Sequence, residues 1–197
     1  MKKCPPILLC ALVLATALAL PGITLAQKGG MARIDSLMAL LPTLANNDTN
    51  KVLLLNDLSF TNHTINTSTG IAFGNNAAQL AVKLLFKKGE AGAYHALCGN
   101  YWAMHNYLLA QKYCFQSLQM YEALQDQKET ARALHNVGSI YESEYDYTAA
   151  TAYYQKAAAM LEAIKEYDMA LGFNADIADV LKLQKNTLRP CGIFKKQ

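Results

Sequence analysis

The stretch ARALHNVGSIYESEYDYTAATAYYQKAAAML, residues 131–161, decides the fold. Two runs of mostly apolar residues in it recur at i, i+3, i+4 and i+7, which is the spacing of one face of an α-helix. The first run is Leu134, Val137, Gly138 and Tyr141, and the second is Ala150, Tyr153, Tyr154, Ala157 and Leu161. Residues 144–146 interrupt the pattern between the two runs. The stretch therefore predicts a helical hairpin whose small residues let the two backbones approach closely.

The hairpin pattern recurs along the chain. Leu97, Tyr101 and Ala110 lie 40 residues before Val137, Tyr141 and Ala150. A weaker copy is marked by Leu55, Leu58 and Ala78, and a fourth copy begins with Ile177, Ala178 and Leu181. One hairpin cannot bury its own apolar face, so successive copies are expected to stack against one another.

This pattern resembles the tetratricopeptide repeat. The resemblance rests on Leu134, Val137-Gly138, Tyr141, Ala150, Tyr154 and Ala157, and on their upstream equivalents Tyr94, Leu97, Tyr101 and Ala110. It implies an all-α, right-handed superhelical solenoid of about three and a half antiparallel helix hairpins. The period of 40 exceeds the usual ~34 residues of this repeat class, so each hairpin should have longer helices, as in kinesin light chain.

The sequence divides into four segments. Residues 1–26 are predicted to be a signal peptide, and residues 27–50 a flexible exit, a leading helix from Met31 to Leu44 and a loop. The repeats are expected at 51–90, 91–130, 131–170 and, in part, 171–186. Residues 187–197 are expected to form an irregular tail, because Pro190 falls where the next helix would run. The last repeat would then leave Ile177, Val180, Leu181 and Leu183 partly uncovered.

The first 26 residues have the features of an export signal. Lys2 and Lys3 precede the apolar run 7–20, and Thr24-Leu25-Ala26 places small residues before a cleavage site. The apolar run is short for a membrane span, which needs ~20 residues. The mature chain is thus expected to be exported, with the periplasm as its compartment; an uncleaved anchor is the alternative.

Composition argues against several functional classes. Without the two leader lysines the chain has 16 basic and 15 acidic residues, and it shows no basic stripe interleaved with aromatics, so nucleic-acid binding is not expected. Phosphate loops, a nucleophile elbow and paired carboxylates are absent from the sequence. We therefore expect no enzyme activity and no cofactor.

The cysteines and histidines admit two interpretations each. Cys98 and Cys114 fall on facing helices of one hairpin; we expect two small buried thiols, with a disulfide as the alternative. His95 and His135 occupy equivalent places in successive repeats. We expect them to line a groove rather than bind a metal, because no third ligand stands at metal spacing.

The resemblance also implies a binding surface. In the family, the first helix of each repeat lines a concave groove that holds a protein or peptide. The matching positions here are Asn56, Asp57, His63, His95, Gly99, Trp102, Arg132, His135, Asn136, Ser139, Asp176 and Asp179. Arg132 would be an anchor for a carboxylate. Trp102 would be a binding hot spot or, equally, a packing residue beside the hairpin turn.

The expected function is that of an exported, non-catalytic adaptor for protein–protein interaction. The chain also resembles exported repeat proteins of the Bacteroidetes type, whose repeats often precede a membrane helix and a kinase, cyclase or DNA-binding module. The alternative is therefore the sensory input region of such a protein, truncated before its output domain. Self-association through the uncapped last repeat is a further expectation.

Overall fold

The computed structural model describes the backbone of residues 21–187 and the side chains from Gly29 onward. Its elements, in chain order, are α1 (Pro21–Leu40), a 3₁₀ turn (Leu41–Thr43), α2 (Thr49–Asn62), α3 (Thr67–Lys83), α4 (Lys87–Ala103), α5 (Tyr107–Ala123), α6 (Gln127–Ser143), α7 (Tyr147–Ala163) and α8 (Tyr167–Thr187). The described part of the chain is all-α. Residues 1–20 and 188–197, with most of the predicted signal peptide and with Pro190, lie outside it.

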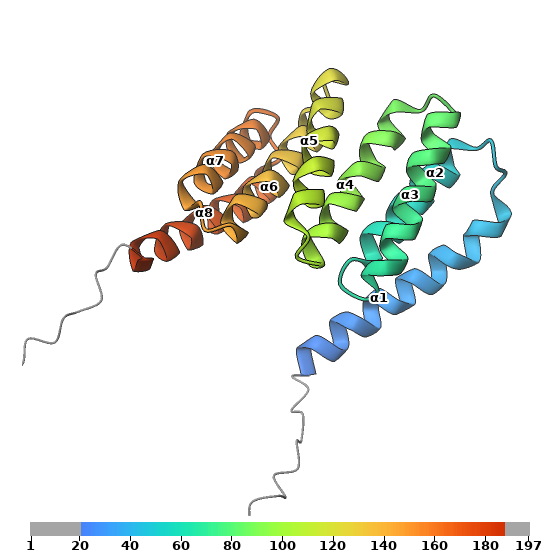
Figure 1. Cartoon of the computed structure of the whole chain (residues 1–197), viewed down its shortest axis with the longest axis horizontal. Helices are drawn as coiled ribbons and strands as arrows, with labels where there is room; N and C mark the ends of the chain where they lie inside the picture. Colours follow the sequence, from blue (N-terminus) through green and yellow to red (C-terminus); the bar gives the residue numbers. More distant parts are fainter. Residues whose placement is uncertain (1–20, 188–197) are drawn as a thin grey trace, which may run out of the picture.

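The helices form a solenoid of hairpins. Figure 1 shows α2 to α8 following one another in chain order, with α1 running beneath the first hairpin. The pairs α2–α3, α4–α5 and α6–α7 each pack as a hairpin, and α8 packs on α7. Neighbouring hairpins meet mainly where the second helix of one packs against the first helix of the next, α3 against α4 and α5 against α6. First helices also contact one another, α2 with α4 and α4 with α6. The predicted solenoid architecture is confirmed.

The 40-residue period follows from one repeated turn. Each helix from α3 to α7 has 17 residues and is followed by three turn residues, so a hairpin occupies 40. The middle turn residue has positive φ in every case: Leu85, His105, Gln125, Tyr145 and Lys165. The N–H of the next residue then donates to the carbonyl five residues earlier, as from Phe86 to Ala81. This is the Schellman ending of a helix.

Polar side chains mark the helix starts. Asn66, Asn106, Asp126 and Asp146 each accept a hydrogen bond from the backbone N–H three residues ahead. Asp48 accepts from the N–H of Asn50 at 2.8 Å and caps α2. Such caps satisfy donors that an isolated helix leaves unpaired.

The core lies between the hairpins and is built from small and branched residues. Leu97, Leu134, Val137 and Leu161 are buried, with alanines at the closest contacts. Gly138 lies against the Tyr154 ring, as the predicted small-against-large packing requires. Val180 is also buried, against Tyr147, Ala150 and Tyr154. The expectation that Val180 is uncovered was wrong, because α8 turns this side chain toward α7; Leu181 and Leu183 remain over 40% exposed.

Two features differ from the sequence prediction. Residues 27–30 belong to α1 and not to a flexible exit, and Gly30 lies against Ile65 of the α2–α3 turn. In the first repeat Ala77, and not Ala78, is the buried alanine, which restores the 40-residue spacing to Ser117 and Ala157.

Cys98 of α4 and Cys114 of α5 are joined by a disulfide, and their Cα atoms lie 5.1 Å apart. The expectation of two free thiols was wrong. The two helices approach closely at these positions because both residues are small, and the resulting Cα separation lies in the range that a disulfide bridges.

Candidate partner-binding surface

A cavity of about 280 Å³ opens on the surface shared by three first helices. Its lining comes from the end of α2, the middle of α4 and the middle of α6: Phe60, His63, Cys98, Gly99, Trp102, His135, Asn136 and Ser139. Residues separated by about 40 positions therefore meet in one place. Six of these eight residues are among the predicted groove positions.

Phe60 and Trp102 are the aromatic residues on the open side of the cavity. Phe60 is 44% exposed and Trp102 is 40% exposed. The Trp102 Nε1–H donates to Ser143 Oγ at 2.9 Å, which fixes the indole between α4 and α6. Trp102 is thus both partly exposed and held in place.

Gly99 gives the cavity its depth. A Cβ placed on Gly99 would have no neighbour within 4 Å, although the residue lies inside α4. The helix surface is therefore open here because a side chain is missing.

His135 is held between two aromatic rings. Its ring stacks on Tyr154 at 4.7 Å and on Phe173 at 4.1 Å between centroids. Its Nε2 lies 2.8 Å from Asp176 Oδ2 of α8. The residue connects α6 to both α7 and α8, and it still contributes to the cavity wall.

His95 is buried instead of groove-lining. It is 8% exposed, and Asn136 Nδ2 donates to its Nε2 at 3.4 Å. Burial, followed by the charges of Arg132 and His135, lowers the pKa of His95 to about 4. The ring is therefore neutral at pH 7 and works as an acceptor for Asn136. Within the described residues no cluster of three His, Cys, Asp or Glu side chains suits a metal ion.

The remaining predicted groove residues make contacts outside the cavity. Arg132 lies 3.3 Å from Glu129, one turn earlier in α6. Asn56 donates to the Gly89 carbonyl, and Asp57 lies 3.9 Å from Arg33 of α1. Asp179 pairs with Lys182 on α8. These residues are not part of the cavity, so the structure brings only some of the predicted positions together.

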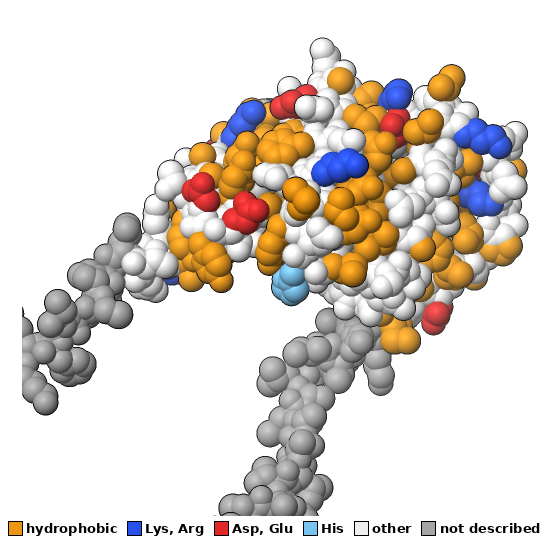
Figure 2. Space-filling view, in the orientation of Figure 1, with side chains coloured by type: hydrophobic (Ala, Val, Ile, Leu, Met, Phe, Trp, Pro, Cys, Tyr) orange, Lys and Arg blue, Asp and Glu red, His pale blue; other side chains and the backbone are white. Residues whose placement is uncertain are grey.

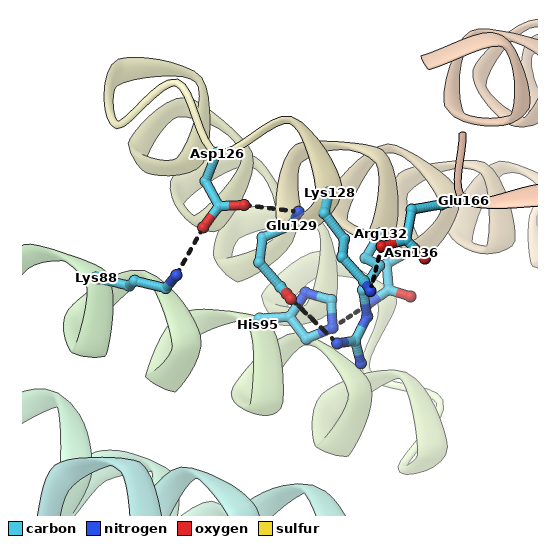
Figure 3. A network of polar contacts seen from close by, with 8 residues as sticks. All are labelled: Lys88, His95, Asp126, Lys128, Glu129, Arg132, Asn136 and Glu166. Carbon is cyan, nitrogen blue, oxygen red and sulfur yellow. Dashed lines mark hydrogen bonds and ion pairs between the residues drawn. The ribbon is translucent and has the colours of Figure 1, made fainter. Parts of the chain in front are cut away.

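A polar network fixes successive repeats relative to one another, as Figure 3 shows. Lys88 contacts Asp126 at 2.9 Å, and Lys128 contacts Glu166 at 2.7 Å. The two pairs are equivalent by the 40-residue period, and each connects a first helix to the cap of the next first helix. The side chains are partly exposed, so each pair contributes modest stability and mainly sets the spacing of the surface.

The sequence analysis missed Phe60 and Ser143. Phe60 lies outside the hairpin pattern, and its period-related residue in the second repeat is the buried Asn100. A signal existed in the sequence, because Phe60 precedes the groove position His63 by one helical turn. Only the packing of α2 against α4 places it beside Trp102.

The rest of the visible surface carries no concentrated charge. In the view of Figure 2, apolar side chains gather over α4 and α5, and charged side chains are scattered among them. No dense basic area appears on this face, in agreement with the balanced charge of the sequence. No helix in the described range 21–187 has the length and apolar character to cross a membrane.

The family model for the tetratricopeptide repeat matches residues 89–163, which correspond to the hairpins α4–α5 and α6–α7. Residues 89–163 therefore form tetratricopeptide repeats. The α2–α3 hairpin continues the same 40-residue period outside the matched range. A comparison with curated protein sequences gives no match.

Solved structures with a similar fold include three repeat-containing proteins. A Rap protein in complex with competence and sporulation factor has a TM-score of 0.74 and 19% identity, over 84% of this chain and 47% of that chain. Aspartyl phosphate phosphatase F from Bacillus subtilis has a TM-score of 0.59 and 14% identity, over 81% and 50%. BtubC (BKLC) from P. vanneervenii has a TM-score of 0.54 and 14% identity, over 82% and 78%. At these identities the likeness concerns the fold, and the chain spans about half the length of the first two.

Proposed function

We propose that this tetratricopeptide repeat protein is a non-catalytic adaptor that binds a protein or peptide partner on the surface of its first helices. The observation that carries the proposal is the cavity shared by α2, α4 and α6, with Trp102 exposed at its edge. Exposed tryptophan in a partly enclosed site is a frequent centre of binding energy. The similar Rap protein is itself in complex with competence and sporulation factor.

The adaptor role is tested by selecting peptides from a random display library against the wild-type protein. We expect Trp102→Ala and Arg132→Ala to weaken binding of the selected peptides about tenfold or more, as loss of a hot spot does. Circular dichroism should show unchanged helicity, because both side chains are partly exposed.

Leu108→Ala is the matched control, since Leu108 is 78% exposed on the second helix α5. If the selected peptides bind the Leu108 variant weakly and both first-helix variants normally, the binding surface does not lie on the first helices.

The second part of the proposal is export. The predicted signal peptide supports it, and so does the disulfide between Cys98 and Cys114, since disulfides persist mainly in oxidising compartments. Amino-terminal sequencing of the protein purified from its native cells is the test. A first residue of Gln27 is expected, whereas a chain that still begins at Met1 would contradict cleavage.

If the protein is made in a compartment that attaches N-linked glycans, the fold limits which asparagines can be modified. The sequence contains Asn-x-Ser/Thr at Asn47, Asn62 and Asn66. The Asn62 side chain is buried and donates to the Leu58 carbonyl, while Asn66 caps α3. Only Asn47 is both exposed and free of a capping role.

A further inference from the structure

The hydrogen-bonding groups of the cavity leave mainly acceptors for a ligand. His63 Nδ1 lies 2.6 Å from the Phe60 carbonyl oxygen. A carbonyl can only accept, so Nδ1 carries the proton and, in the neutral ring, Nε2 is an acceptor. His135 has the opposite arrangement: its Nε2 faces the carboxylate of Asp176, so that in the neutral ring Nδ1 is the acceptor.

Most side-chain donors at the cavity already have a partner, although Asn136 uses only one of its two N–H groups. Trp102 Nε1–H donates to Ser143, and Ser139 Oγ donates to the His135 carbonyl and lies 3.0 Å from the Tyr154 hydroxyl. Asn136 donates from Nδ2 to His95, and its Oδ1 makes no hydrogen bond within the described residues. A ligand therefore meets acceptors from the end of α2 and from α6, around an aromatic wall.

The charge near the cavity is negative. Asp176 is bound to His135, and Glu142 accepts from the Tyr154 hydroxyl at 2.8 Å, three residues after Ser139. Neither lysine nor arginine is among the lining residues. Arg132, one turn before Asn136, is paired with Glu129.

We propose that this cavity binds an arginine side chain of the partner, which rests on the proposed function of the same surface. A guanidinium group has five N–H donors and no acceptor, so it matches acceptors placed on different helices. Its plane stacks on aromatic faces such as that of Trp102. A carboxylate would face unpaired acceptors, and a purely apolar side chain would leave them without partners, which is costly. The volume of about 280 Å³ suits one side chain rather than a whole cofactor.

The test uses N-acetyl-arginine amide as the probe and N-acetyl-citrulline amide as its uncharged analogue. Trp102 is the only tryptophan in the chain, so its fluorescence reports directly on the cavity. We expect saturable quenching by the arginine probe with a Kd of about 1 mM, and binding of citrulline at least about tenfold weaker, because the charge is lost.

Gly99→Leu should fill the cavity and abolish the fluorescence change. Gly172→Leu is its control, because Gly172 also lies inside a helix with open space where a Cβ would stand, but outside the cavity. His63→Phe removes one acceptor and keeps an aromatic ring at a half-exposed position. This variant should weaken binding of the arginine probe severalfold. It tests the proposal even if Gly99→Leu fails to fold.

Equal binding of arginine and citrulline, no saturation, or undiminished binding in Gly99→Leu would each overturn the proposal. The adaptor role fails in a different way. If the selected peptides need Trp102 for binding but are not enriched in arginine, the arginine site is contradicted and the adaptor role still stands. If the selected peptides bind the first-helix variants as well as the wild type, both the arginine site and the adaptor surface are contradicted.

Discussion

Gly138 of α6 lies so close to Tyr154 of α7 that a Cβ at position 138 would come within 2.6 Å of two ring carbons, Cδ1 and Cε1. The Tyr154 ring is 1% exposed and its hydroxyl is bonded to Ser139 and Glu142, so the ring has little room to move. This contact sets the distance between the two helices of the third hairpin.

The close contact predicts opposite effects of one substitution at two glycines. Gly138→Ala should lower the free energy of unfolding by about 1–3 kcal/mol through overpacking. Gly99→Ala, where a Cβ meets open space, should raise it by about 0.5–1 kcal/mol, because alanine loses less entropy in a helix. Urea denaturation of both variants measures the difference. A stabilised Gly138 variant would mean that the hairpin opens more readily than its packing indicates.

The left-handed turn residues predict a stabilising change. Leu85 has φ of 55° and is 82% exposed, so its side chain contributes little while its backbone is unfavourable. Leu85→Gly should raise the free energy of unfolding by about 1 kcal/mol. Leu171→Gly, at a similarly exposed position inside α8, should lower it by about 1 kcal/mol. Thermal unfolding of the two variants should shift in opposite directions; equal shifts would contradict the turn geometry.

The disulfide predicts a stability difference between oxidised and reduced protein. Cys98 and Cys114 close a loop with a sequence separation of 16, which corresponds to about 3 kcal/mol of stabilisation from chain entropy. Denaturation with and without a reducing agent measures this contribution. The Cys98→Ala/Cys114→Ala variant should unfold identically in both conditions, and a wild-type protein indifferent to reduction would show that the bond contributes nothing.

His95 predicts that acid weakens the fold. Burial lowers its pKa to about 4 in the native protein, against about 6.5 in the unfolded chain. Between these values the unfolded chain binds a proton that the native chain does not, so stability falls as pH falls. The loss is about 1.4 kcal/mol per pH unit, or about 3 kcal/mol in all.

Urea denaturation at several pH values from 7 to 4 measures the slope. His95→Gln should reduce the slope of stability against pH by about 1.4 kcal/mol per pH unit, which is the contribution of one proton. An unaltered acid slope in the His95 variant would assign the effect to other groups.

The apolar periodicity of residues 131–161 could be predicted directly from the sequence, because it depends on neighbours within one helical turn or one hairpin. The break at residues 144–146 coincides with the turn between α6 and α7. The candidate site was predicted less well. His95 and Asn56 share the repeat position of groove residues, yet Asn56 bonds to the Gly89 carbonyl and His95 is covered by its neighbours.

By itself, the sequence determined the helices, their hairpin pairing and the 40-residue repeat, since these follow from local spacing and from the need to bury one face of each hairpin. Only the tertiary structure decided that Phe60, Trp102 and His135 surround one cavity, and that Cys98 and Cys114 join. The physical reason is distance. Whether side chains about 40 residues apart meet depends on how closely successive helices pack, and that closeness is set by small residues and interrepeat contacts acting together.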